Sequence, residues 1–248
     1  MREREGLFLA EGPQAVREAV ACRPDVVRDL YVDPEAAERH SDVLLLAREH
    51  GIFVHEVSPD VLAAMCDTQA PQGIAAVCRT LETGLEAVLA ARPRLLTVLT
   101  NVRDPGNAGT VIRGADAAGA DAVLVSDASV DVYNPKVVRS TAGSLFHLPV
   151  VTGLPVPTLL QGVRAAGLVL LAADGSGTQL LDDTDLTRPH AWVMGNEAWG
   201  LEPHVLEACD EAVRVPIYGK AESLNLAMAA TVCLYASARA QRAAGQSR

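Results

Sequence analysis

The feature that most constrains this chain is a regular alternation of short apolar runs with longer helix-like segments from residue 94 onward. Runs such as Leu95–Leu99 are short, rich in Leu, Val and Ala, and typical of strands buried in a parallel sheet. The alternation predicts an α/β fold with helices on both faces of the sheet. We expect strands at 95–99, 122–125, 148–151, 168–172, 191–194 and 212–215, and helices at 107–118, 134–141, 155–166, 202–208 and 224–240.

The first third of the chain predicts a second, smaller αβ unit. Its expected strands lie at 8–11, 30–32, 52–57 and 74–78, and its expected helices at 13–22, 34–50 and 59–65. Pro93 ends the stretch that joins the two parts. We therefore expect an amino-terminal domain at 1–79, a linker at 80–93 that is partly helical, and the larger domain at 94–248. The polar tail from Arg239 is expected to fray.

Composition favours a soluble protein with reduced thiols. Hydrophobic residues make up 49% of the 248 residues, which is enough for a sizeable core. No apolar run approaches the roughly 18 residues of a membrane span, and the charged start of the chain argues against a signal peptide. The five cysteines contain no CxxC pair, and the histidines have no metal-like spacing. We expect a cytoplasmic protein without a metal.

The net charge of −10 argues against indiscriminate binding of nucleic acid, because that binding relies on Lys and Arg at phosphates. Residues 1–80 alone carry 14 acidic and 8 basic side chains. Net charge is not the local field, however. Arg103, Arg113, Lys136 and Arg139 are expected near one edge of the larger sheet. For an RNA partner, this composition predicts weak affinity for bulk RNA and recognition of a shaped site.

Three segments place polar residues after expected strands. Asn107 and Arg113 follow the run at 95–99, and Glu197 follows the run at 191–194. Ser223 and Asn225 lie where a tight turn meets the apolar helix expected at 224–240. Ligands of open α/β sheets bind at the carboxyl ends of the strands, so these segments predict a common site.

Simpler explanations exist for each of these side chains. Ser and Asn are favoured helix caps, which accounts for one of Ser223 and Asn225 but not for both. Taken alone, Arg113 is better explained by a surface ion pair with Asp104 or Asp116. The helix after Asn225 is almost wholly apolar, and we expect it to be buried on most faces.

Common nucleotide-binding fingerprints are missing. No GxGxxG follows the first strand of the larger domain, and Gly175-Ser-Gly-Thr stops short of one. Gly219-Lys220 lacks the earlier glycine and the Ser or Thr of a P-loop. Neither a dinucleotide-binding fold nor a P-loop NTPase is therefore indicated.

Taken together, the three segments resemble the SpoU family of RNA 2′-O-ribose methyltransferases, part of the SPOUT superfamily. The resemblance covers about residues 94 to 240, and both the order and the spacing of the motifs fit. It rests on Asn107 and Arg113 in the first motif, on Gly195, Glu197, Gly200 and Leu201 in the second, and on Pro216, Gly219, Ser223, Leu224 and Asn225 in the third.

The resemblance implies S-adenosylmethionine as cofactor, a carboxyl-terminal trefoil knot and a homodimer. The expected cofactor contacts, made mostly by main chain, are Gly195, Gly200, Val215, Ile217 and Leu224. From the residues themselves, the glycines suit points where the chain bends sharply or approaches a ligand closely.

The resemblance also implies a catalytic group of Arg113, Asn107, Glu197, Ser223 and Asn225. Arg113 acts either as the base or as an anchor for the phosphate beside the target ribose. A base role requires a neutral guanidine, whereas Arg is effectively always protonated. We expect the two asparagines to bond Arg113, the ribose or the cofactor, and Ser223 to orient the same network. Glu197 either pairs with Arg113 or fixes its turn.

The amino-terminal segment Gly6-Leu-Phe-Leu-Ala-Glu-Gly-Pro, with Gln72-Gly73-Ile74 in the last strand, resembles the small substrate-binding domain fused to many SpoU enzymes. This domain favours ribosomal RNA as substrate, with transfer RNA as the alternative. Two further hypotheses are an RNA-binding protein without catalysis and a small-molecule α/β enzyme. The motif residues argue against the first, and the missing fingerprints argue against the second.

Overall fold

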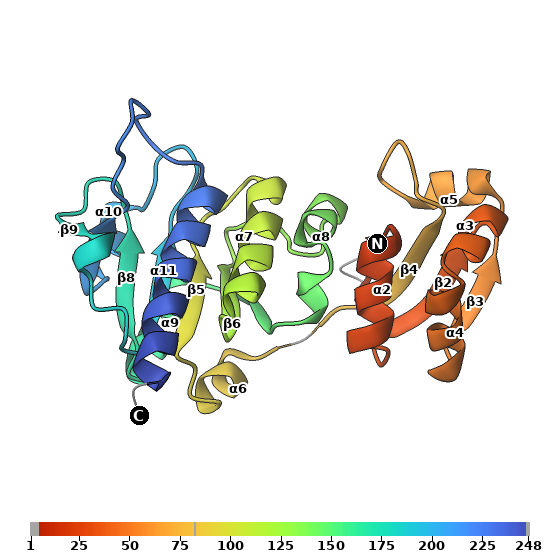
Figure 1. Ribbon diagram of the computed structural model, residues 1–248, viewed down its shortest axis with the longest axis horizontal. Helices are drawn as coiled ribbons and strands as arrows, with labels where there is room; N and C mark the ends of the chain where they lie inside the picture. Colours follow the sequence, from red (N-terminus) through yellow and green to blue (C-terminus); the bar gives the residue numbers. More distant parts are fainter. Residues whose placement is uncertain (1–4, 82, 247–248) are drawn as a thin grey trace. The chain divides into compact units, whose positions relative to one another are not determined.

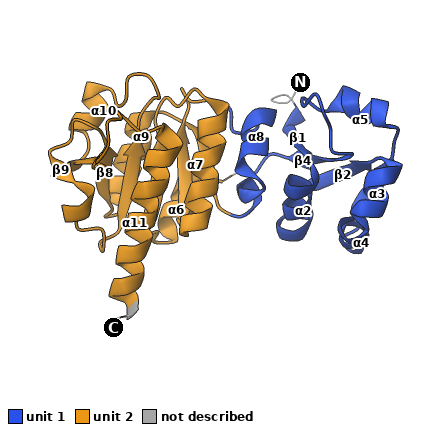
Figure 2. Ribbon diagram, turned by 45° about the horizontal axis from the view of Figure 1, so that its top comes forward, with its two compact units in different colours: residues 1–82, 131–147 blue, residues 83–130, 148–248 orange. Residues whose placement is uncertain are grey.

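The computed structural model describes residues 5–81 and 83–246, and the chain divides into two compact units (Figure 2). Unit 1 comprises residues 1–82 and 131–147, and unit 2 comprises residues 83–130 and 148–248. The charged start of the chain, on which the expectation about a signal peptide rests, falls mainly outside the described residues.

Unit 1 is a four-stranded sheet with helices on it, as the sequence predicts. The strand order is β1-β4-β2-β3, in which β4 runs antiparallel to β1 and β2. The expected helix at 34–50 is wrong in one respect, because the backbone of His40 leaves the helical conformation and divides it in two. The elements are β1 (Leu7–Glu11), α2 (Pro13–Cys22), β2 (Val27–Val32), α3 (Pro34–Arg39), α4 (Ser41–Glu49), β3 (Phe53–Glu56), α5 (Pro59–Met65) and β4 (Ile74–Arg79).

The segment 131–147, with α8 (Pro135–Thr141) and the 3₁₀ turn η1 (Ser144–Phe146), packs in unit 1. The ion pairs of Arg139 explain much of the packing of this segment in unit 1. Its Nη1 donates to Glu11 Oε2 at 2.8 Å and its Nη2 to Asp67 Oδ2 at 3.0 Å. A buried carboxylate such as Glu11 requires partners of this kind. The expectation that Arg139 adds positive charge to the larger sheet is therefore wrong.

Unit 2 contains a seven-stranded sheet in the order β7-β6-β5-β10-β8-β11-β9, with every neighbouring pair parallel. All six expected strands are present; five lie within one residue of their expected ends, and the strand expected at 148–151 lies at 150–154. The short edge strand β9 was not expected. The strands are β5 (Leu95–Leu99), β6 (Ala122–Ser126), β7 (Val150–Leu154), β8 (Val169–Ala173), β9 (Gln179–Leu180), β10 (His190–Met194) and β11 (Glu211–Arg214).

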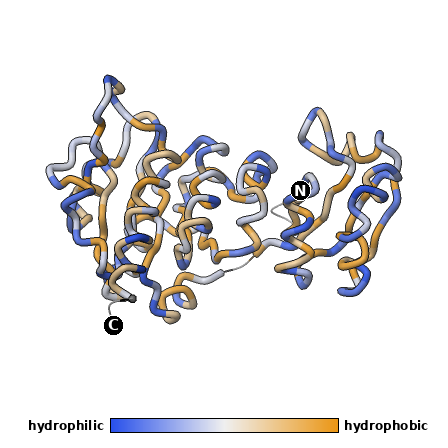
Figure 3. The backbone as a smooth tube through the Cα atoms, viewed as in Figure 1, coloured by the Kyte–Doolittle hydropathy of each residue, from blue (hydrophilic) through white to orange (hydrophobic). Residues whose placement is uncertain are grey.

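Helices cover both faces of this sheet (Figure 1). On one face α7 packs beside α11, and on the other α6 packs beside α9, which buries the apolar side chains of the strands between them (Figure 3). The α-helices of unit 2 are α6 (Leu85–Ala90), α7 (Pro105–Ala118), α9 (Val156–Ala165), α10 (Pro203–Glu207) and α11 (Leu226–Gln246).

Helix α11 differs from its expected form. It begins at Leu226 rather than 224 and continues to Gln246, so the tail from Arg239 is helical. It buries one face only. Its outer face leaves Met228 61%, Val232 43% and Tyr235 45% exposed. An almost uniformly apolar helix still has only one side against the sheet, which the sequence pattern does not reveal. No helix among the described residues is long and apolar enough to cross a membrane.

A buried polar group fixes α11 to the sheet. Ser237 Oγ lies 2.7 Å from His190 Nε2, accepts a hydrogen bond from Trp192 Nε1 at 2.9 Å, and donates to the Cys233 carbonyl at 3.0 Å. Trp192 itself is fully buried. His190 is also buried, and burial lowers its pKa.

We predict that Ser237→Ala lowers the free energy of unfolding by about 1–3 kcal/mol, because it leaves the buried indole N–H of Trp192 without a partner. Urea unfolding followed by tryptophan fluorescence measures this. Thr110→Ala, which removes an exposed hydroxyl bonded within α7, is the matched control and should change stability little. Equal stability of the two variants would contradict the role given to Ser237.

Candidate active site

The carboxyl ends of β5 and β10 lie side by side, which brings the first two motif segments together. Leu99 pairs with Met194 in the register of these strands. Thr100 extends the pairing, since its amide and its hydroxyl both donate to the Met194 carbonyl at 2.9 Å. The loops that follow the two strands therefore leave the sheet from adjacent points.

Glu197 holds the segment that leads into α7. Its Oε2 accepts from the Arg103 amide at 3.2 Å, and its Oε1 accepts from the Asp104 amide at 3.1 Å and from Asn107 Nδ2 at 3.4 Å. A carboxylate is stabilised there because the first amides of a helix lack intrahelical partners and carry partial positive charge. One side chain thus joins the turn after β10 to the start of α7.

Asn225 connects the third segment to the first. Its Nδ2 donates to Asn107 Oδ1 at 2.9 Å, while its Oδ1 accepts from the amides of Ala227 at 2.9 Å and Met228 at 3.4 Å. Helix capping therefore explains Asn225, together with its bond to Asn107. It does not explain Ser223, whose side chain is exposed and has no hydrogen-bond partner in the described part of the chain.

Arg113 lies on the exposed side of α7, and in residues 5–81 and 83–246 it forms no ion pair or hydrogen bond. The surface ion pair with Asp104 is absent because the Asp104 carboxylate caps α7, accepting from the Asn107 amide at 2.7 Å. The neighbouring Gly114 lets α11 come close, since a Cβ there would lie 2.9 Å from Thr231 Oγ1. A free guanidinium thus projects from a helix held tightly against α11.

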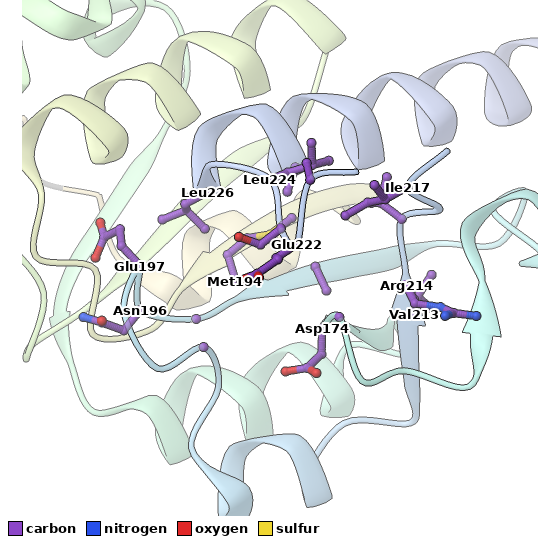
Figure 4. A pocket seen from close by; sticks show the side chains of 18 of the residues that line it. Asp174, Met194, Asn196, Glu197, Val213, Arg214, Ile217, Glu222, Leu224 and Leu226 are labelled. Atoms are coloured by element: carbon purple, nitrogen blue, oxygen red, sulfur yellow. The ribbon is translucent and has the colours of Figure 1, made fainter. Parts of the chain in front are cut away.

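A cavity of about 560 Å³ opens at this edge of the sheet (Figure 4). It is bounded by the ends of β8, β10 and β11 and by the long loop that leads from β11 to α11 (Figure 1). All five residues expected to contact a cofactor line it, and so do Glu197 and Ser223. Asn107, Arg113 and Asn225 do not. The cofactor set is Gly195, Gly200, Val215, Ile217 and Leu224.

Gly195 is required by the turn itself. A Cβ at this position would lie 2.2 Å from the Gly200 carbonyl carbon, where Asn196 and Gly200 exchange main-chain hydrogen bonds of 2.8 and 2.9 Å. Gly200 has a φ of 72°, in the left-handed region that suits glycine. Gly219, by contrast, has open space where a Cβ would stand.

The loop at 215–224 offers its main chain to a ligand. Between these positions no amide or carbonyl forms a hydrogen bond with any described residue. The apolar side chains of Met194, Ile217, Leu224 and Leu226 lie beside this main chain (Figure 4). Free main-chain groups beside apolar walls suit the adenine of S-adenosylmethionine, so the residues present fit the cofactor that the resemblance implies.

Two carboxylates at the cavity were missed by the sequence reasoning. Asp174 and Glu222 both line it, and Asp174 lies across from Leu224 and Ile217 (Figure 4). Such groups suit the ammonium, the sulfonium and the ribose hydroxyls of the same cofactor. Asp174 directly follows β8, so the rule that led to Glu197 also applies to it. Glu222 precedes Ser223 and carried no separate signal.

Asn196 is a further missed residue, and its role is structural. It is 6% exposed, its Nδ2 donates to the Asn101 carbonyl at 2.7 Å, and its Oδ1 accepts from the Ala198 amide at 2.8 Å. Asn101 is itself held with a φ of 55°, and its Nδ2 donates to Glu202 Oε1 at 2.8 Å. These amides fix the two loops next to the cavity.

Comparison with known proteins agrees with this geometry. Residues 94–235 match the SpoU rRNA Methylase family, and residues 9–84 match the RNA 2′-O ribose methyltransferase substrate binding family. The 23S rRNA (guanosine(2553)-2′-O)-methyltransferase RlmP of Bacillus subtilis is 37% identical, over 94% of this chain and 89% of that protein. The 23S rRNA (uridine(2479)-2′-O)-methyltransferase of Streptomyces viridochromogenes is 35% identical, over 99% of this chain and 86% of that protein.

A solved structure is similar over nearly the whole chain. The SpoU methyltransferase AviRb from Streptomyces viridochromogenes, in complex with the cofactor AdoMet, aligns with a TM-score of 0.82 and 36% identity. The alignment covers 98% of this chain and 94% of that one. The second and third motif segments line one cavity, the first is bonded to both, and the family match spans more than half of the residues, so this chain belongs to the SpoU rRNA methylase family.

Proposed function

We propose that this chain is an S-adenosylmethionine-dependent methyltransferase that modifies a ribose 2′-hydroxyl of ribosomal RNA. The observation that carries the proposal is the meeting of the three motif segments at the carboxyl edge of the sheet, where the second and third segments line one cavity and Asn107 of the first is bonded to both of them. Incubating the purified chain with tritiated cofactor and ribosomal RNA tests it directly. Labelled 2′-O-methylnucleoside in the RNA digest is the expected result.

In this proposal the loop at 215–224 and the turn at 195–200 hold the cofactor. Leu224 and Ile217 would pack against the adenine, main-chain groups near Gly195 and Val215 would bond to its edge, and Asp174 and Glu222 would meet the ammonium, sulfonium and hydroxyl groups of the cofactor. When bound, the cofactor supplies an electrophilic methyl group, which the ribose 2′-oxygen takes as it loses its proton. The protein then has to place that oxygen in line, and positioning of this kind accounts for much of the rate.

Arg113 is suited to anchor the phosphate beside the target ribose. An exposed guanidinium without a partner keeps its charge and presents a planar fork that matches phosphate oxygens. A base role would require a neutral guanidine, whereas Arg is effectively always protonated in proteins. Ser223, with a free hydroxyl at the cavity, orients the substrate. The linked Asn107, Glu197 and Asn225 keep α7 in place.

Ribosomal RNA is favoured over transfer RNA because the match to relatives named for 23S rRNA extends over both units. We assign residues 1–79 to binding of the RNA substrate, residues 80–93 to the linker and residues 94–248 to the methyltransferase domain. The five free cysteines and the ribosomal substrate support a cytoplasmic location. The trefoil knot remains a prediction from the resemblance.

We further propose a homodimer formed through α11. Its outer face presents Met228, Val232 and Tyr235, spaced four and three residues apart and therefore on one side of the helix. Tyr235 also donates to the Ala117 carbonyl of α7 at 3.4 Å, so this face adjoins the helix that carries Arg113. A contiguous apolar stripe of this kind is typical of protein–protein contacts.

Arg113→Ala should separate chemistry from cofactor binding. We predict a fall in kcat of about 100- to 1,000-fold, as for loss of a single group that stabilises a transition state. The affinity for S-adenosylmethionine, measured by calorimetry, should stay within about twofold, because the residue does not line the cavity. Arg48→Ala, at an exposed arginine on α4, is the control. Full activity of Arg113→Ala would refute the assigned catalytic centre.

A substrate with 2′-deoxyribose only at the modified nucleotide should accept no methyl group, because the reacting hydroxyl is missing. Binding of this RNA should match that of the unmodified RNA. Tritium transfer to the two RNAs, followed by nucleoside analysis, makes the comparison. Label at the deoxy position would show that the methyl group goes to a base.

Val232→Glu should convert the dimer to a monomer, because a charge at the centre of an apolar interface is left without a partner. Light scattering at micromolar concentration should give the mass of two chains for the wild type and of one chain for the variant. Leu45→Glu, at a residue 58% exposed on α4, should leave the dimer intact. A monomeric wild type would disprove the dimer.

A further inference from the structure

One face of the unit 1 sheet carries aromatic side chains from β2 and β3. Helices α2 and α4 pack together on the opposite face. In the strand register Tyr31 pairs with His55, so these two side chains share a face with Phe53, two residues away. Leu30 pairs with Val54 and points to the helical side, where it is fully buried.

The three rings form a continuous surface. Tyr31 and His55 stack with centroids 4.6 Å apart and planes at 8°, and Phe53 meets His55 edge-on at 4.6 Å. Phe53 is 65% exposed, which is unusual for a phenylalanine on an edge strand. The nearby carboxylate of Asp29 is occupied, with His55 Nε2 at 3.0 Å and Arg28 Nε at 3.5 Å. The patch therefore consists of flat rings beside the Asp29 carboxylate, which is paired with His55 and Arg28.

The same face ends in a basic group. Arg79 pairs with Leu7 in the register, and Val77 pairs with Leu9, so Arg79 shares the face of Val77, which pairs with Asp29. Arg79 and Arg28 line a hollow of about 490 Å³ together with Glu5, Gly6, Leu7 and Thr80. Both arginines are exposed, and Arg79 Nη1 donates to the Asp25 carbonyl at 3.1 Å. The face therefore carries guanidinium groups that can bind phosphate as well as the aromatic patch.

We propose that this face, defined by Tyr31, Phe53, His55 and Arg79, binds unpaired nucleotides of the substrate RNA. The inference rests on the proposed function and specifies which surface of unit 1 reads the RNA. Unpaired bases stack on exposed aromatic rings of a sheet, and arginine contacts the phosphate between them. The acidic composition of residues 1–80 is compatible with this binding mode, because stacking supplies affinity that the net charge does not.

Phe53→Ala in the full chain tests the proposal. Loss of one base stack should raise the Kd for a fluorescein-labelled single-stranded RNA from the substrate by about 5- to 150-fold. KM for RNA should rise in parallel, with kcat at saturating RNA and the affinity for S-adenosylmethionine unchanged. Phe53→Tyr should bind like the wild type. Leu45→Ala, at a similarly exposed apolar residue on α4, is the matched control, and circular dichroism verifies folding of each variant.

Arg79→Gln tests the phosphate contact. The slope of log Kd against log salt concentration should become shallower by about 0.7 for this single-stranded RNA, and Arg79→Lys should restore it. A wild type that methylates RNA, with Phe53→Ala no weaker than Leu45→Ala, overturns the binding face alone. A wild type that transfers no methyl group, yet binds RNA in a way that depends on Phe53, overturns the proposed function and supports the face. Absence of both methyl transfer and RNA binding overturns both.

Discussion

The carboxylate of Glu197 is the interaction on which the site depends. It lies between the turn after β10 and the start of α7, and it accepts hydrogen bonds from two main-chain amides and one side-chain amide. Asn107 also accepts a hydrogen bond from Asn225, and the side chain of Asn225 caps α11. Three loops that are far apart in sequence are therefore fixed by a short chain of hydrogen bonds, and α7 presents Arg113 from a rigid base.

The rest of the site is built around unpaired main chain. The loop at 215–224 bonds to no described main-chain group, while the turn at 195–200 closes on itself so tightly that only glycine fits at position 195. The turn and the loop have different roles. The closed turn fixes the main chain on one side of the cavity, and the loop keeps its amides and carbonyls available for a cofactor.

Unit 1 shows how local charge differs from total charge. The buried Glu11 recruits Arg139 from a segment more than a hundred residues away in sequence, so this arginine serves the packing of unit 1. The exposed arginines at positions 28 and 79 remain at one end of the sheet. A count of acids and bases cannot distinguish these uses, because it does not record which charges are paired.

The sequence by itself determined the parallel sheet, the smaller αβ unit and the family. Apolar runs such as Leu95–Leu99 identify buried strands, and prolines at the first helical position mark where α2, α3 and α5 begin. The break at His40 and the exposed stripe on α11 were not predictable in this way. Neighbouring residues there suit a continuous or a buried helix equally well, and only the packing partners decide.

The same division applies to the site. The motifs identified Asn107, Glu197 and Asn225, but their bonding partners depend on the register that sets Leu99 beside Met194, which no local pattern records. Asp174 and Glu222 reach the cavity for the same reason. The tertiary structure alone left Arg113 without a partner among residues 5–81 and 83–246, and it alone placed Phe53, His55 and Tyr31 on one face. Pairing and exposure are set by the neighbours that folding brings from distant parts of the chain.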